Sequence, residues 1–346
     1  MTKRAAIILS GGKAERFQTT QDKWQDKALA KLNGKPLLIH AIENIQEIVD
    51  EIFVVVNEEA RRTKYQDILL RHQVENTRIV TDVKINHLSG PLIAILTGLK
   101  FSKADYCLTI PADMPMVSEK VADYMFNEIK NSYVAVPMWP NSSLETLMMV
   151  LERHKILKIT NLLCELDRSR PGEIIRAALN VLFVSPLDEI KNFDPELKSF
   201  VNINTQKDLS QLQPRQGKGP FIKNMRLTLG ILPTVQLELL LKACLEQNIT
   251  NLKANEIFSS CAVDLEKEKS HYWAAVSREF EAKSLLSASM LNCKCNLAKD
   301  AKTAFLKAAC NYSLEAKIYE KNCCYLLAER AKADEAWCEL QVMRNS

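Results

Sequence analysis

A glycine-rich turn near the start of the chain carries residue types that bind phosphates. The apolar run Ala5–Leu9 ends in Ser10-Gly11-Gly12, and Lys13 and Arg16 follow shortly after. Glycines let backbone N–H groups face a ligand with no side chain in the way, and nearby cations neutralise a phosphate chain. The turn therefore predicts a nucleoside triphosphate site, although turns of this kind also serve other ligands. The Gly-Lys-Ser/Thr sequence of a Walker-type phosphate loop is missing at the required spacing.

Four further polar residues lie downstream of the turn or directly after apolar runs: Lys27, Asn57, Asp82 and Asp113. Transfer of a nucleotidyl group needs cations on the phosphates, a carboxylate that holds Mg²⁺ and a pocket for the base. Asp113 is the candidate for the metal, and Lys27 for the phosphates. Local roles stay open as alternatives, because Asp113 can cap a following helix and Asn57 and Asp82 can be turn residues.

Apolar runs alternate with helical patterns over the first part of the chain. Predicted strands are Ala5–Leu9, Ile52–Val56, Arg78–Val80, Tyr106–Ile110, Tyr133–Pro137, Leu144–Leu151, Ala178–Val184 and Phe200–Ile203. Predicted helices are Pro36–Ile48, Glu59–Arg71, Pro91–Phe101 and Ser118–Lys130. This alternation predicts an α/β fold with a mainly parallel, Rossmann-like sheet and helices on both faces. In such a sheet the ligand lies beyond the carboxyl ends of the strands.

The pattern changes near residue 211. The segment Gln211–Pro220 is rich in proline and glycine, which is typical of a linker. Beyond it, predicted helices are Thr234–Gln247, Leu252–Cys261, Lys267–Asn292, Leu297–Asn311, Leu314–Arg330 and Ala333–Met343. A weak similarity between Arg278–Asn292 and Thr303–Lys317 suggests stacked helix pairs, similar to tetratricopeptide repeats. We therefore predict a nucleotide-binding domain over 1–212, a linker over 213–220 and an all-α domain over 221–346.

Composition sets limits on location and partners. The net charge of +4 over 346 residues is small and spread along the chain, so it gives no reason to expect a nucleic-acid partner. No apolar run is long enough to span a bilayer, and the run before the first turn is too short for a signal peptide. We therefore expect a cytoplasmic protein. Most of the ten cysteines lie after residue 220, and we interpret them as small buried side chains rather than disulfides or zinc ligands.

The order of these motifs resembles the molybdenum cofactor guanylyltransferase family of MobA-like, Mg²⁺-dependent nucleotidyltransferases. The resemblance covers residues 1–212, and the helical part has no counterpart in it. The matching segments are Leu9–Arg16, Asp26–His40, Val54–Asn57, Asp82, Ser89–Leu99, Ile110–Pro115 and Phe200–Leu209. The resemblance implies transfer of GMP from GTP to the phosphate of the molybdenum cofactor, with release of pyrophosphate and with Mg²⁺ as the metal.

The resemblance also implies a role for each matching residue. Leu9, Ser10 and Gly11 would contact the nucleotide through backbone groups, and Gly12 would keep the turn open. Arg16 and Lys27 would neutralise the phosphates, and Asp113 would bind Mg²⁺. Asn57 and Asp82 would hold the guanosine. Asn202 and Asn204 would close the far side of the site, near the metal or the pterin substrate.

One segment departs from the family pattern. The segment Phe17–Asp26 separates Arg16 from Lys27, where the family has a shorter loop, and it creates a second Asp-Lys pair, Asp22-Lys23. We assign Lys27 because the residues after it are in family register. Two alternatives stay open: a related nucleotidyltransferase with another NTP or phosphorylated acceptor, and a catalytically disabled domain that serves as a protein-interaction platform. A protein partner would bind through the helical domain.

Overall fold

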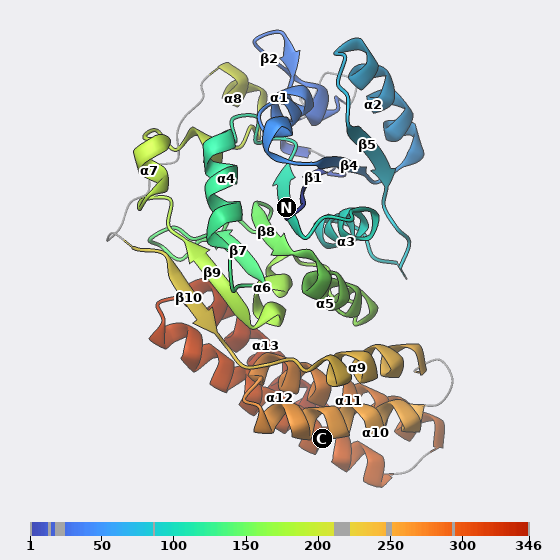
Figure 1. Ribbon diagram of the computed structural model, residues 1–346. Coiled ribbons are helices and arrows are strands. Elements are labelled where there is room, and N and C mark those ends of the chain that lie inside the picture. The colour runs from blue at the N-terminus through green and yellow to red at the C-terminus, as the bar shows by residue number, and fades with distance from the viewer. Residues whose placement is uncertain are drawn as a thin grey trace. The chain divides into compact units, whose positions relative to one another are not determined.

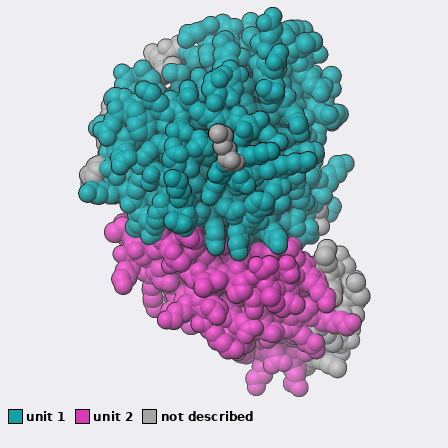
Figure 2. Space-filling view, in the orientation of Figure 1, with its two compact units in different colours: residues 1–174, 181–226 teal, residues 175–180, 227–346 magenta. Residues whose placement is uncertain are grey.

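The computed structural model describes residues 2–12, 15–17, 25–85, 87–210, 222–246, 251–292 and 295–344 (Figure 1). The chain divides into two compact units (Figure 2). The first unit contains Met1–Ile174 and Val181–Arg226, and the second contains Ile175–Asn180 and Leu227–Ser346. The chain therefore passes between the units three times. The predicted linker over 213–220 lies outside the described residues, so the predicted domain limits stay a prediction.

An eight-stranded sheet forms the framework of the first unit, with the order β10-β9-β7-β8-β6-β1-β4-β5. Its strands are β1 (Arg4–Leu9), β4 (Glu51–Val56), β5 (Thr77–Thr81), β6 (Tyr106–Pro111), β7 (Val134–Pro137), β8 (Met149–Glu152), β9 (Asn180–Val184) and β10 (Met225–Thr228). Strand β1 pairs in parallel with β4 and β6, β4 with β5, and β7 with β9. Strand β8 is antiparallel to β6 and β7. The mainly parallel α/β fold predicted from the sequence is confirmed.

Two predicted strands are wrong in extent or kind. The expected strand Leu144–Leu151 is reduced to β8, because Glu145 turns its side chain inward and accepts a hydrogen bond from the Trp139 ring N–H at 2.7 Å. The expected strand Phe200–Ile203 begins in the short 3-10 helix η4 (Lys198–Phe200). There Asp194 accepts the backbone N–H groups of Lys198 and Ser199, and these bonds favour a helical turn over a strand.

Alternating residues of β1 pack on the two faces of the sheet. Ala6 and Ile8 belong to a buried cluster with α1 (Leu37–Glu43) and α4 (Glu119–Glu128). Ile7 points the other way, toward α3 (Pro91–Phe101), where a Cβ built on Gly98 would lie 2.4 Å from its Cγ2. Glycine at this position therefore lets α3 approach the strand closely. Helices on both faces are visible around the sheet in Figure 1.

The helices begin and end largely where local signals place them. Pro91 stands at the first position of α3 after Gly90, whose φ of 108° favours glycine. Ser118 caps α4 by accepting the Val121 N–H at 3.2 Å. The predicted helix Pro36–Ile48 is shorter, because α1 ends at Glu43 and a separate turn, η3 (Gln46–Ile48), follows. The remaining helices of this unit are α2 (Glu59–Arg71), α5 (Arg153–Glu165), α7 (Ile190–Phe193) and α8 (Gln206–Ser210), and α6 (Gly172–Ala178) begins in this unit and continues into the second.

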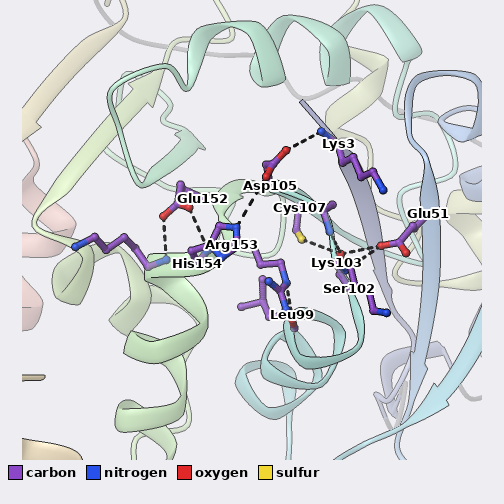
Figure 3. A network of polar contacts seen from close by, with 12 residues as sticks. Lys3, Glu51, Leu99, Ser102, Lys103, Asp105, Cys107, Glu152, Arg153 and His154 are labelled. Atoms are coloured by element: carbon purple, nitrogen blue, oxygen red, sulfur yellow. Dashed lines mark hydrogen bonds and ion pairs between the residues drawn. The ribbon is translucent and has the colours of Figure 1, made fainter. Parts of the chain in front are cut away.

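Side-chain carboxylates satisfy backbone groups at the amino ends of the central strands, as Figure 3 shows. Asp105 accepts the backbone N–H of Lys3 at 2.8 Å. Glu51 accepts the N–H of Lys103 at 3.0 Å and the hydroxyl of Ser102 at 3.1 Å. These polar groups are used in hydrogen bonds within the protein, so they are not available to a ligand at this end of the strands. The opposite edge, at the carboxyl ends, carries the candidate site.

The second unit consists mainly of long helices that each pack against the next along the chain. They are α9 (Thr234–Glu246), α10 (Asn251–Lys267), α11 (His271–Asn292), α12 (Cys295–Lys321) and α13 (Tyr325–Arg344). The break predicted between Asn311 and Leu314 is wrong, since α12 runs through it. There the Asn311 amide donates to Glu266 and to the Lys307 carbonyl, and Tyr312 is buried, so these polar residues are used within the helix.

A buried arginine organises this second unit. Arg176, which is 1% exposed, donates from Nε and Nη2 to Glu315 at 2.7 and 2.6 Å and from Nη1 to Asp334 at 2.6 Å. The rings of Tyr272 and Tyr312 lie 4.8 and 5.6 Å from its guanidinium carbon. The short segment Ile175–Asn180 is therefore joined to α12 and α13 by charge as well as by packing. Among the described residues, no helix is long and apolar enough to cross a membrane.

Candidate active site

The carboxyl ends of four parallel strands meet at one edge of the sheet. Leu9, the last residue of β1, pairs with Val55 in β4 and with Pro111 in β6, and Val56 pairs with Thr81 in β5. The residues that follow these strands therefore gather at this edge. They are Ser10 after β1, Asn57 after β4, Asp82 after β5 and Asp113 shortly after β6.

The glycine turn is open at this edge. Neither Gly11 nor Gly12 has a positive φ, so conformational strain does not require glycine at either position. A Cβ built on Gly12 would meet nothing within 4 Å, whereas one on Gly11 would lie 3.5 Å from the Cβ of Asn57. The space beside Gly12 is thus free for a ligand to approach the backbone. Lys13 lies outside the described residues.

The backbone of Ser10 is engaged within the protein. Its N–H donates to the Val55 carbonyl at 2.9 Å, and its carbonyl accepts from Arg61 at 2.9 Å. The carbonyl of Leu9 accepts the Ala112 N–H at 3.0 Å. Backbone contacts from Leu9 and Ser10 to a nucleotide stay a prediction. Arg16 lies in a short 3-10 helix, η1 (Glu15–Phe17), and its side chain is exposed.

Lys27 and Asp113 meet at the centre of the edge. Lys27 begins the 3-10 helix η2 (Lys27–Leu29), and its Nζ pairs with Oδ2 of Asp113 and donates to Oδ1 of Asn204 at 3.1 Å. The Ile203 N–H donates to the Asp113 carbonyl at 2.9 Å, which fixes the Asn202–Asn204 segment beside the Asp113 loop. The structure therefore brings Lys27, Asp113 and Asn204 together, whereas Asn202 is half-buried and, among the described residues, shares no hydrogen bond with Lys27. The alternative pair Asp22-Lys23 lies outside the described residues.

Two buried carboxylate oxygens at this edge lack a hydrogen-bond partner among the described residues: Oδ1 of Asp82 and Oδ1 of Asp113. A buried acceptor without a donor costs free energy, so each is poised to accept a ligand or a metal. Burial raises the pKa of Asp82 from 3.8 to about 6. Asp113 fits Mg²⁺, which takes oxygen ligands and is commonly bound by one or two carboxylates together with substrate phosphates and water. The described residues contain no group of three or more His, Cys, Asp or Glu placed to hold a metal.

Sequence reasoning missed Asp208. This carboxylate accepts the backbone N–H groups of Asn204 and Thr205, each at 2.7 Å. Burial opposes ionisation, but these N–H donors outweigh it and hold the pKa of Asp208 below its usual value. The charge of Lys27 acts in the same direction. Asp208 therefore fixes the turn that presents Asn204, and its spacing four residues after Asn204 was the available signal.

Sequence reasoning also missed a buried polar cluster behind the site, which we call the Asp26 cluster: Ser10, Asp26, Arg61 and Tyr65. The Tyr65 hydroxyl lies 3.0 and 3.1 Å from the carboxylate oxygens of Asp26 and 2.8 Å from Oγ of Ser10. Nε of Arg61 lies 3.1 Å from Asp26. Arg61 and Tyr65 are four residues apart in α2 and so share one helix face. That spacing, close after Asn57, was the signal that could have found them.

A mainly parallel sheet with these residues at its carboxyl edge is the framework of a nucleotidyltransferase. The MobA-like NTP transferase domain matches residues 6–180, about half of the chain, and the protein belongs to this family. The match ends before α9, so it leaves helices α9 to α13 outside the family domain.

Curated relatives agree with this assignment. A probable molybdenum cofactor guanylyltransferase of Methanosarcina acetivorans is 30% identical over 210 residues, which is 60% of this chain and 89% of that protein. A protein of the same description from Bacillus anthracis is 28% identical over 214 residues, 62% of this chain and 97% of its own. A solved structure of molybdopterin-guanine dinucleotide biosynthesis protein A from Archaeoglobus fulgidus is 21% identical and covers 61% of this chain and 96% of its own, with a TM-score of 0.47.

Proposed function

We propose that the first unit transfers GMP from GTP to the terminal phosphate of the molybdenum cofactor. An oxygen of the acceptor phosphate forms a bond to the α-phosphorus of GTP, the bond between that phosphorus and the α–β bridging oxygen breaks, and pyrophosphate leaves with the electron pair. Both products remain anions, so no general base is required when the acceptor phosphate is already ionised. The names of the relatives support this choice of nucleotide and acceptor.

The observation that carries the proposal is the meeting of Lys27, Asp113 and Asn204 beside an open glycine turn. Phosphoryl and nucleotidyl transfer depend mainly on positioning and on neutralising charge at the phosphates. Lys27 would neutralise charge as it develops on the α- and β-phosphates, and the exposed Arg16 would add a second cation to the triphosphate. Asp113 would hold Mg²⁺ through its unpartnered oxygen. The metal, when bound, supplies further positive charge at the phosphates.

The base would lie toward Asp82 and Asn57. Asn57 uses its Oδ1 to accept from Arg61 at 3.0 Å, and this bond orients its amide group outward as a donor. The unpartnered oxygen of Asp82 is an acceptor, and guanine offers two adjacent N–H donors on one edge. The pair therefore suits guanosine. Asn202 and Asn204 would close the side of the site that faces the pterin.

The test is pyrophosphate release from GTP and Mg²⁺ in the presence of the molybdenum cofactor. The substitution Asp113→Ala should abolish release while the circular dichroism spectrum stays that of the native protein. Asp67→Ala, at an exposed position of α2, is the matched control and should keep full activity. Full activity of Asp113→Ala would overturn the assignment.

Thermal shifts with each of the four NTPs and Mg²⁺ test the choice of nucleotide. We expect GTP to raise the melting temperature selectively, since a ligand that binds only the folded state stabilises it. Selective stabilisation by CTP would indicate a related nucleotidyltransferase with another acceptor. Absence of any shift would favour a disabled domain that acts as an interaction platform.

A further inference from the structure

The carboxylate of Asp26, next to Lys27 in the chain, is buried and bonded within the protein on both of its oxygens. Its side chain is 6% exposed, and both oxygens have partners. The Tyr65 hydroxyl and the Ala28 N–H donate to Oδ1, at 3.0 and 3.2 Å, and Nε of Arg61 pairs with Oδ2 at 3.1 Å. A carboxylate enclosed in this way has no free acceptor for a nucleotide or a metal. Asp26 therefore acts by holding other parts of the protein in place.

Helix α2 uses Arg61 and Tyr65 to hold two separate parts of the chain. Besides Asp26, Nη1 of Arg61 donates to the Ser10 carbonyl at 2.9 Å and to Asn57 at 3.0 Å. The Tyr65 hydroxyl also bonds to Oγ of Ser10 at 2.8 Å. One helix face therefore fixes both ends of the segment between Ser10 and Asp26. Burial, followed by the negative charge of Asp26, raises the pKa of Tyr65, so its hydroxyl keeps its proton throughout the physiological range.

The Asp26 cluster acts on Lys27 through the backbone. Asp26 is the N-cap of η2, and its bond to the Ala28 N–H defines the turn that Lys27 begins. Helix η2 has only three residues, so it has little stability of its own and depends on this cap. From that turn Nζ of Lys27 reaches Asp113 and Asn204. Displacement of Asp26 would therefore displace the lysine ammonium group.

We propose that Asp26, Arg61 and Tyr65 are positioning residues that hold Lys27 in its reactive location while fixing the glycine turn at Ser10. This rests on the proposed function of Lys27 at the phosphates. Because α2 bonds to both Ser10 and Asp26, it fixes the two residues that flank this segment.

The substitution Tyr65→Phe removes the hydroxyl and keeps the ring. We expect kcat for nucleotide transfer to fall about 10- to 100-fold, with KM for GTP changed by less than about 3-fold, because the lysine charge matters most in the transition state. Tyr124→Phe is the control, since it also removes a tyrosine hydroxyl from the first unit, one that is half-buried and accepts a hydrogen bond from Asn224. It should leave kcat unchanged. Arg61→Lys, which keeps the charge but loses the forked donors, should resemble Tyr65→Phe.

A double-mutant cycle separates positioning of Lys27 from a general structural effect. Lys27→Met alone should lower kcat about 100- to 1000-fold. In the Lys27→Met background, Tyr65→Phe should cost less than about 3-fold, since the group it positions is gone. If instead the two effects multiply, Tyr65 does not act through Lys27 and the proposal is overturned.

Hydrogen exchange gives a readout that needs no activity. In the nucleotide-free full chain, Tyr65→Phe should increase exchange at the amides of Ala28 and Ala30 at least about 10-fold, since both N–H groups are bonded within the Asp26–Ala30 turn. Unchanged exchange there would overturn the proposal. If the wild-type protein lacks transfer activity but Tyr65→Phe still increases this exchange, the proposed function is refuted and the positioning role of the cluster stays supported.

Discussion

The raised pKa of Asp82 has a consequence for stability that can be measured without a substrate. A carboxyl whose pKa rises from 3.8 to about 6 in the folded protein opposes folding when ionised. At 1.36 kcal/mol per pKa unit, the whole difference corresponds to about 3 kcal/mol. The side chain is half-buried, so water screens part of this cost, and we expect about 1 to 2 kcal/mol. Asp82→Asn should therefore stabilise the nucleotide-free protein by that amount at neutral pH.

The pH dependence has a definite sign. Between its unfolded pKa of 3.8 and its folded pKa of about 6, Asp82 binds more protons in the folded state than in the unfolded state. The free energy of unfolding therefore falls as pH rises through this interval, and the cost is fully present above it. Well below pH 3.8 the carboxyl is neutral in both states and the cost vanishes. The advantage of Asp82→Asn should thus grow between pH 4 and 6 and stay constant above.

The measurement is urea-induced unfolding of the full chain, followed by circular dichroism, at about pH 4.5 and about pH 8. Asp67→Asn, at an exposed position of α2, is the control and should change the free energy of unfolding by less than about 0.5 kcal/mol. Saturating GTP and Mg²⁺ should reduce or reverse the advantage of Asp82→Asn, because the nucleotide then needs the carboxylate. An Asp82→Asn protein that is less stable than the wild type at pH 8, or equally favoured at both pH values, would refute the reasoning.

Two further predictions concern packing. Gly98→Ala should destabilise the protein by about 1 to 3 kcal/mol in urea unfolding, since the new Cβ collides with the buried side chain of Ile7. The matched change Gly172→Ala, whose Cβ would meet one atom at 3.9 Å, should be neutral or slightly stabilising, and an equal loss in both would contradict the argument. Arg176→Met removes the guanidinium that is bonded to the buried Glu315 carboxylate and should cost about 3 to 5 kcal/mol in the same assay. A loss below about 1 kcal/mol would show that the buried ion pair contributes little.

The sheet and its site edge could be predicted because both follow from local patterns. Fully apolar runs such as Ile52–Val56 become central parallel strands, and the polar residue after each run lies at the carboxyl edge. The ends of helices were predictable where a capping residue marks them, as at Ser118. The break in α12 was wrong because Asn311 and Tyr312 find buried partners from other helices, which no local pattern shows. Tertiary contacts there override the local tendency to end the helix.

The residues around the site also fall into two groups: those marked by a local sequence pattern and those whose role depends on tertiary contacts. Asn57, Asp82 and Asp113 could be proposed from the sequence because each follows a recognisable strand, and Lys27 because the residues after it match the family pattern. Asp208 escaped because its effect passes through the backbone of another segment. The Arg61–Asp26 pair escaped for the same reason, since it joins residues far apart in sequence. Contacts of this kind depend on the fold as a whole, so they become visible only when the fold is known.

The contrast in hydrogen bonding supports the distinction between binding and positioning residues. Among the described residues, the buried carboxylate oxygens without a partner belong to Asp82 and Asp113, and both lie at the carboxyl edge of the sheet. Folding alone would not favour two unsatisfied acceptors, since each carries a desolvation cost. Asp26, by contrast, has donors on both oxygens although it lies next to Lys27 in the chain. A site retained only as a scaffold would gain stability by satisfying or replacing Asp82 and Asp113. Their persistence as open acceptors beside a fully bonded Asp26 is the pattern expected of a site that still binds a ligand.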